Sequence, residues 1–274
     1  MPVHLVSDTS AELPAEEVAR RPISLVPAAA VVGQARYTDF GGGPDPGWDA
    51  LAAAAGGEPS PPSVREYGAA MADALHAGAQ VLCLPGPVTG ARAEDAAAAA
   101  RLRQHGAHDV VVQRPGVAGV GLGAVLLELA DHASEWDLGA ALAALRDHTG
   151  DAFYLVSEQG TLARRGLLEG VERRLGALAD RVLLCRLAPE VVPIAALDAK
   201  AAVGDVLVRL ADAVRGQPGY VVVSSGRNEF DARRLAAASD ELGGTLLRAT
   251  LSTTSAAVFG AGAVGIGASR RPAL

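Results

Sequence analysis

MPVHLVSDTSAELP, residues 1–14, opens the chain with a short apolar run that stops at small polar residues. Val3 to Val6 is typical of a strand, and Asp8, Thr9 and Ser10 come soon after it. A strand that ends at small polar residues and leads into a helix is how an open α/β sheet builds a site at its carboxyl edge. We therefore predict an α/β fold with a candidate site at this strand end.

The same polar residues have a simpler structural interpretation. The hydroxyl of Thr9 or Ser10 could cap the helix that follows, and Pro14 suits the first turn of that helix. Asp8 would then belong only to a cap and a turn. The residues alone leave both interpretations open.

Composition excludes several classes of function. The chain has 274 residues, a formal net charge of −7 and 50% apolar residues, enough for a sizeable core. An acidic chain without a basic cluster argues against nucleic acid as a partner. No segment approaches the roughly 18 unbroken apolar residues of a membrane span, and no basic region with an apolar run opens the chain as in a signal peptide. We expect a soluble, cytoplasmic protein.

Apolar runs alternate with helical patterns along the chain, and this order predicts two α/β domains of modest size. Gly150 follows the last helix of the first half, so we place the boundary there, with domains at 1–150 and 151–274. Two extended runs around Gly33 predict a hairpin, and Ser63 with Glu66 predicts a capping box. The other expected strands are 81–84, 109–112, 153–157, 181–187, 191–197, 220–223 and 245–251, and the expected helices include 64–77, 138–149, 201–214 and 231–242.

The order of these segments resembles that of the DegV family of lipid-binding proteins. Its members begin with a strand followed by Asp-Ser/Thr-Ser and, a few residues later, Leu-Pro, and the matching residues here are Asp8, Thr9, Ser10, Leu13 and Pro14. A strand that ends in Pro, a glycine turn and Tyr-x-Asp come next in the family, as do Pro27, Gly33, Tyr37 and Asp39 here. The resemblance implies an N-terminal parallel sheet flanked by helices and a C-terminal α/β domain with a mixed sheet.

The family's polar segments, which hold the lipid head group, are matched only in part. In its Thr-Ser-Gln-Pro-Ser segment, Ser60, Pro62 and Ser63 match, Pro59 stands in place of the first Thr, and Pro61 replaces Gln. In its Ser-Ser-x-Leu-Ser-Gly-Thr segment, Thr89 and Gly90 remain, and Pro85 and Gly86 replace the serines.

Two glycine-rich segments complete the resemblance. Gly121 lies where the family keeps its backbone close to the ligand, and Gly260 with Gly262 overlays its C-terminal His-x-Gly-Pro-Gly, with Val258 in the His position. The same glycines form a G-x-G-x-x-G pattern, which we do not interpret as a dinucleotide site. That motif needs a strand before it, a helix after it and an acidic residue about 20 positions further on.

The resemblance implies a fatty-acid-binding protein with no catalytic residues and no cofactor, which presents its acyl chain to a fatty acid kinase. The acyl chain would lie in an apolar tunnel next to the junction of the two domains. Because Pro59, Gly86 and Val258 replace polar residues, we expect weaker or altered head-group binding. The candidate contacts are Thr9, Ser10, Ser60, Pro62, Gly86, Thr89, Gly90, Gly121, Gly260 and Gly262.

Two alternatives remain at this point: an enzyme that uses Asp8 and Ser10, or a partner-binding relic whose tunnel has collapsed. The pattern His105-x-x-His108 is more typical of a solvated loop than of a metal site. Cys83 and Cys185 lie in apolar runs, which is typical of reduced core thiols.

Overall fold

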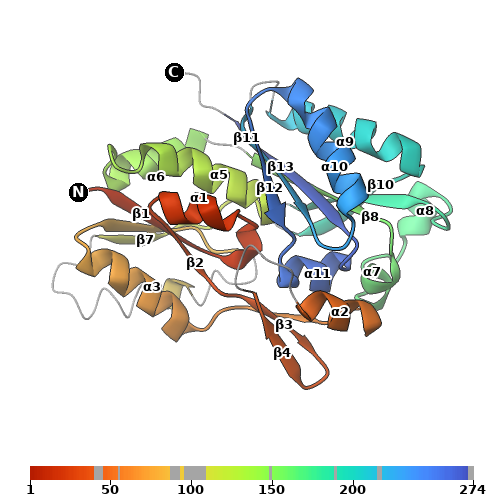
Figure 1. The fold of residues 1–274 in the computed structure, drawn as a ribbon, viewed down its shortest axis with the longest axis horizontal. Coiled ribbons are helices and arrows are strands. Elements are labelled where there is room, and N and C mark those ends of the chain that lie inside the picture. Colours follow the sequence, from red (N-terminus) through yellow and green to blue (C-terminus); the bar gives the residue numbers. More distant parts are fainter. Residues whose placement is uncertain are drawn as a thin grey trace.

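The computed structural model describes residues 1–39, 46–54, 56–86, 93–95, 109–147, 150–187, 190–214 and 218–270. In this part of the chain, helices flank and separate a parallel sheet, a mixed sheet and a small antiparallel sheet (Figure 1). The parallel sheet belongs to the first half of the chain and the mixed sheet to the second half. The α/β class expected from the sequence is therefore confirmed.

The parallel sheet has the strand order β2-β1-β6-β7. Its strands are β1 (Val3–Asp8), β2 (Ile23–Val26), β6 (Gln80–Cys83) and β7 (Val110–Val112), and every neighbouring pair is parallel. The carboxyl ends of all four strands thus meet at one edge, which places Asp8 beside the residues that follow Cys83.

Helices cover both faces of this sheet (Figure 1). Val6 packs toward α3 (Val64–His76), whose buried residues include Tyr67 and Met71. Leu5, on the opposite face, belongs to the main core with α5 (Gly119–His132) and α6 (Leu138–Asp147), and α1 (Ala15–Arg20) contacts β2. The predicted capping box of Ser63 and Glu66 is present at the start of α3.

The mixed sheet has six strands in the order β10-β9-β8-β13-β11-β12. Only β11 and β12 pair in parallel; the other neighbours are antiparallel. Helices α9 (Ala199–Val214) and α10 (Glu229–Ser239) cover one face through a separate apolar cluster. The strands are β8 (Gly150–Val156), β9 (Val182–Leu187), β10 (Val191–Leu197), β11 (Pro218–Ser225), β12 (Thr245–Thr250) and β13 (Val264–Arg270).

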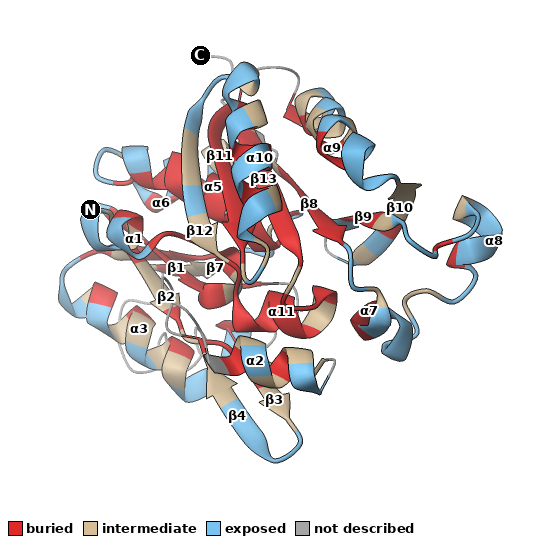
Figure 2. Cartoon of the chain, turned by 45° about the vertical axis from the view of Figure 1, so that its right-hand side comes forward, coloured by how far each residue is buried: buried red, intermediate tan, exposed pale blue. Residues whose placement is uncertain are grey.

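The third sheet has the order β4-β3-β5 and includes the predicted hairpin at Gly33, where φ is +60°. Its strands are β3 (Ala29–Val32), β4 (Ala35–Thr38) and β5 (Glu58–Ser60). Helices α2 (Pro46–Ala53) and α11 (Thr253–Phe259) pack against it, and α11 is largely buried (Figure 2). The remaining short helices are α7 (Gly160–Arg164), α8 (Val171–Leu175), η1 (Thr9–Ala11) and η2 (Asp240–Leu242).

Helix α5 joins the two large sheets through backbone contacts on both of its sides. A Cβ atom on Gly121 would lie 2.6 Å from the Asp151 carbonyl oxygen, and one on Gly267 would lie 2.4 Å from the Gly121 nitrogen. On the other side, a Cβ on Gly123 would lie 2.2 Å from the Ala11 carbonyl oxygen. The helix can approach both neighbours this closely only because these positions carry no side chain.

The prediction that Thr9 or Ser10 caps α1 was wrong: α1 begins at Ala15, Pro14 is its N-cap without a side-chain hydrogen bond, and Asp8 caps η1 instead. The cause is Glu12, whose left-handed backbone (φ 54°) separates η1 from α1. The glycines of the G-x-G-x-x-G pattern lead into β13 rather than a helix, which confirms that it is no dinucleotide motif.

Both cysteines are buried and unbonded to each other, as predicted. His105 and His108 lie outside the described residues. Among the described helices, none combines the length and the apolar character needed to cross a bilayer.

We predict that Gly267→Ala lowers the free energy of unfolding by about 3 kcal/mol, because the new methyl group would collide with the backbone of α5. Gly204→Ala is the matched control in α9, since a Cβ there meets nothing within 4 Å and should stabilise the helix by about 1 kcal/mol. Urea unfolding of both variants measures the difference. Equal stabilities would show that α5 does not touch β13.

Candidate functional site

A cavity of about 560 Å³ lies at the carboxyl edge of the parallel sheet, against α11 and the start of α5. This volume falls within the roughly 300–1,000 Å³ that is usual for small-molecule sites. Each of the three sheets, or the segment next to it, contributes to the wall. The lining residues are Asp8, Ser10, Ala28, Glu58, Pro59, Pro61, Gly86, Ala118, Gly119, Arg165, Leu167, Leu187, Glu190, Val191, Thr254, Ser255, Val258 and Phe259.

Asp8 organises the sheet edge that borders the cavity. Its carboxylate is buried, and one oxygen accepts hydrogen bonds from the backbone N–H (3.0 Å) and the hydroxyl of Ser10. The other oxygen accepts from the Tyr67 hydroxyl (2.7 Å) and the Gly86 N–H (2.9 Å). The carboxylate therefore ties the end of β1 to α3 and to the segment after β6.

Gly86 must be a glycine for this arrangement to exist. A Cβ atom there would lie 2.5 Å from the Ser10 hydroxyl oxygen and 3.1 Å from an Asp8 carboxylate oxygen. A side chain at position 86 would separate the Gly86 N–H from Asp8 and move the cavity wall.

Most of the wall is apolar. Phe259 stacks on Tyr154 with ring centroids 4.1 Å apart, which fixes one side of the cavity. Leu167, Leu187 and Val258 add aliphatic surface. Charged groups are fewer; among them the Arg165 guanidinium lies 3.4 Å from the Glu58 carboxylate.

Behind this wall lies Glu12, a buried carboxylate whose hydrogen-bond partners among the described residues are hydroxyl and N–H groups. It accepts from the hydroxyls of Ser224, Tyr154 (3.3 Å) and Ser252 (3.1 Å). Burial raises the pKa of Glu12 to about 7, and hydrogen bonds from Ser224, Ser255 and Ser252 act in the opposite direction. Because Ser255 also lines the cavity, this network connects η1 with the C-terminal half at the site.

The structure places the expected contact residues in different surroundings. Ser10 and Gly86 line the cavity. Thr9 lies behind it, where its hydroxyl accepts the Ala28 N–H at 2.9 Å. Thr89 and Gly90 lie outside the described residues.

The other expected contacts lie away from the cavity lining. Ser60 borders a separate hollow near Arg36, and Pro62 is buried beside it in the chain. Gly121 packs on the backbone of β8, Gly260 ends α11 with φ +92°, and Gly262 approaches the Glu158 carboxylate.

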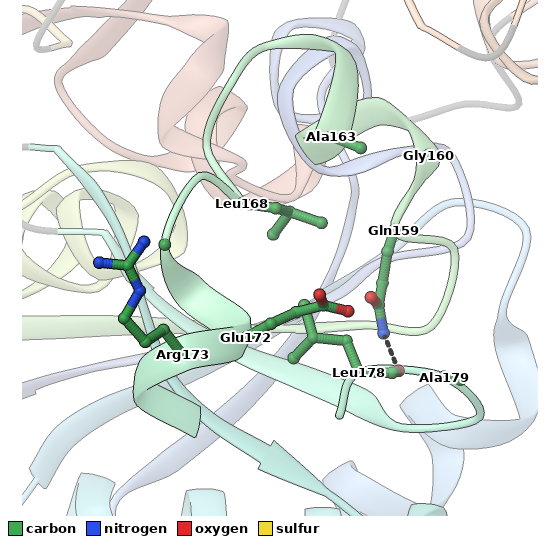
Figure 3. Close-up of a pocket in the computed structure, with 9 residues that line it drawn as sticks. Gln159, Gly160, Ala163, Leu168, Glu172, Arg173, Leu178 and Ala179 are labelled. Atoms are coloured by element: carbon green, nitrogen blue, oxygen red, sulfur yellow. Dashed lines mark hydrogen bonds between the residues drawn. The ribbon is translucent and has the colours of Figure 1, made fainter. Parts of the chain in front are cut away.

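A second cavity, of about 690 Å³, lies around α7 and α8 (Figure 3). Gln159 fixes its rim by donating to the carbonyl oxygens of Leu178 (2.9 Å) and Arg181 (2.8 Å). Glu172 and Arg173 line it from an exposed helix. None of the residues expected from the sequence borders this cavity, so we regard the cavity at the sheet edge as the candidate site.

Sequence reasoning missed Tyr67, Glu12 and, among the α11 residues of the cavity, Thr254, Ser255 and Phe259. Tyr67 falls on the apolar face of a predicted helix and carries no local sign of a polar role. The one available signal was Glu12, a carboxylate placed between Ala11 and Leu13 directly after a strand end. In the described part of the chain, no group of three His, Cys, Asp or Glu side chains is arranged to hold a metal ion.

Comparison with known proteins gives a consistent result. Residues 2–271 match the model of the DegV family, which is described as uncharacterised. No curated protein matches the chain. A structure described as fatty acid binding of a DegV family protein from Thermus thermophilus has a TM-score of 0.78 and 22% identity, covering 99% of this chain and 100% of that one.

Two further solved structures share the fold. DegV of Bacillus subtilis, described as a fatty acid binding protein, has a TM-score of 0.76 and 18% identity, covering 99% of this chain and 100% of its own. A stearic acid-binding protein from Eubacterium ventriosum has a TM-score of 0.82 and 16% identity, covering 98% of both chains. At these identities the similarity shows the fold.

We predict that Asp8→Ala lowers the free energy of unfolding by about 3 kcal/mol or more, because it leaves buried donors of Tyr67, Gly86 and Ser10 without their acceptor. Asp49→Ala is the control: this exposed carboxylate lies 3.7 Å from Arg227, and its loss should change stability by no more than about 0.5 kcal/mol. Chemical denaturation compares them. If both variants lost equally little free energy of unfolding, the hydrogen bonds of Asp8 would not stabilise the fold as described.

We predict that stability falls as pH rises from about 4.5 to 7, in proportion to the ionisation of Glu12. The folded state holds the proton up to a pKa of about 7 and the unfolded state releases it near 4.5, so the folded state binds more protons in this window. The contribution is therefore present below pH 4.5 and is lost as pH passes 7. Glu12→Gln should remove the contribution of Glu12, about 3 kcal/mol in the free energy of unfolding, from the pH dependence measured by urea unfolding. A variant with the same pH profile as the native chain would contradict the assignment.

Proposed function

Because this chain belongs to the DegV family, we propose that it binds one long-chain acyl lipid, a fatty acid or a related molecule, in the cavity at the sheet edge. The main support for this proposal is the chemical character of the cavity wall. Phe259, Val258, Leu167 and Leu187 give it an apolar surface, and polar groups gather at the strand end near Asp8.

Such a wall suits a flexible hydrocarbon chain. Each methylene that leaves water contributes about 0.8 kcal/mol, which offsets the cost of ordering the chain. The head group then mainly sets the direction in which the lipid lies. In this proposal Ser10 and Gly86 are contact residues, and Thr89 and Gly90, three and four positions after Gly86, stay predicted contacts.

The proposal extends to what the chain does with its ligand. We propose a carrier that sequesters the acyl chain in the cytoplasm and presents it to a separate kinase, without catalysing a reaction itself. Support for the kinase comes from the family resemblance. An enzyme built on Asp8 and Ser10 is less favoured, because both oxygens of Asp8 already accept hydrogen bonds from the chain. A collapsed tunnel is likewise less favoured, because the cavity is open enough to hold a ligand.

We predict that Val258→Trp abolishes lipid binding, with at least a roughly tenfold loss of affinity, because the indole would occupy the cavity. Val208→Trp on α9 is the control, since Val208 is 63% exposed and lies outside the cavity lining. Native mass spectrometry with oleic acid and with 1-monooleoylglycerol measures occupancy, and circular dichroism checks the fold. A folded Val258→Trp variant that binds as the native chain does would place the lipid elsewhere.

A further inference from the structure

We infer that the polar end of this cavity selects an acyl lipid whose head group is uncharged and donates hydrogen bonds, in preference to a free fatty acid. The inference rests on the proposed function, since it concerns the ligand of that same cavity. It names the chemistry of the head group, which the family resemblance leaves in doubt for this chain.

The charge around the cavity is unfavourable for a carboxylate ligand. Asp8, Glu58 and Glu190 all line it, and Arg165 is the one cationic side chain that does so among the described residues. Arg165 lies 3.4 Å from the Glu58 carboxylate, so its charge is partly balanced within the chain. A fourth carboxylate would meet like charge, which disfavours its ionised form and weakens its binding.

The donors at the sheet edge are already directed to a carboxylate of the chain. The Ser10 hydroxyl and the Gly86 N–H both donate to Asp8, which is fully buried. A bound carboxylate needs several N–H or O–H donors of its own. To obtain them from the Ser10 hydroxyl and the Gly86 N–H, it would have to compete with Asp8, whose buried charge these donors stabilise.

Three further positions on the wall offer no side-chain donor. Pro59, Gly86 and Val258 all line the cavity, and each stands where the family resemblance leads us to expect a polar residue. A polar side chain could not be placed at position 86 without moving Ser10, because a Cβ atom there would lie 2.5 Å from the Ser10 hydroxyl oxygen. The Thr254 and Ser255 hydroxyls also line the cavity, but they too have hydrogen-bond partners within the chain, Ser252 (3.0 Å) for Thr254 and Glu12 for Ser255. Among the described residues, the side-chain hydroxyls of the wall are therefore already engaged, whereas carboxylate oxygens remain as acceptors.

A hydroxyl head group complements such a wall. A fatty alcohol or a monoacylglycerol donates hydrogen bonds to carboxylate oxygens and carries no charge into the cavity. The acyl chain of such a lipid would contact the apolar part of the wall in the same way as the acyl chain of a fatty acid. Discrimination thus depends on the head group alone.

The test compares ligands that share one acyl chain: oleic acid, oleyl alcohol and 1-monooleoylglycerol, titrated into the full chain at neutral pH and measured by native mass spectrometry. We expect the two hydroxyl lipids to bind about tenfold more tightly than oleate. The double variant Glu58→Gln/Glu190→Gln should reduce the ratio of hydroxyl-lipid affinity to oleate affinity about threefold or more, because it removes two negative charges that repel oleate. Glu172→Gln, which lines only the cavity around α7 and α8, should leave the ratio unchanged.

The outcomes separate the two proposals. If oleate binds more tightly than both hydroxyl lipids, or if Glu172→Gln changes the ratio as much as the double variant, the inference is wrong while lipid binding stands. If none of the three lipids binds, the proposed function itself fails, and the inference fails with it.

Discussion

The close backbone approach of α5 to both neighbours is the constraint on which the rest of the structure depends. Gly121 and Gly267 bring the helix against β8 and β13, and Gly123 brings it against the carbonyl oxygen of Ala11. The end of β1 is thereby held at a fixed distance from the mixed sheet. The cavity occupies the space beside the start of this helix, where Ala118 and Gly119 form part of its wall.

Two buried carboxylates complete this junction in different ways. Asp8 accepts hydrogen bonds from within the first half of the chain and shapes the sheet edge. Glu12 accepts them from hydroxyl groups of the second half, those of Ser224 and Ser252, and forms no ion pair within the described part of the chain. Its raised pKa reflects the cost of burial that hydroxyl donors only partly offset. The site thus combines a rigid polar edge with an apolar wall, as a binding protein requires.

Sequence patterns were sufficient for the fold and for one end of the site. Most of the strands, the hairpin at Gly33 and the capping box at Ser63 follow from local rules and are present, whereas β5 and β13 were not expected from the sequence. Because β1 and β6 are parallel, the expected site at the end of β1 and the expected contact Gly86 lie at the same edge of the sheet. The boundary at residue 150, which is the first residue of β8, stays a prediction.

The rest of the site depends on contacts between distant segments, which local patterns do not encode. Glu12 and Ser252 are 240 positions apart in sequence, and no spacing rule predicts that they meet. Gly121 illustrates a different difficulty. A close backbone approach was expected there, but the neighbour in the structure is the carbonyl oxygen of Asp151 in β8. A glycine indicates that something comes near, and only the tertiary fold identifies what that is.

Native mass spectrometry of the chain as purified and after incubation with acyl lipids measures whether the cavity beside α5 holds such a lipid. We predict a mass excess equal to one single-chain lipid, which extraction with organic solvent removes and added lipid restores. A chain that shows only its own mass in both conditions would contradict the account.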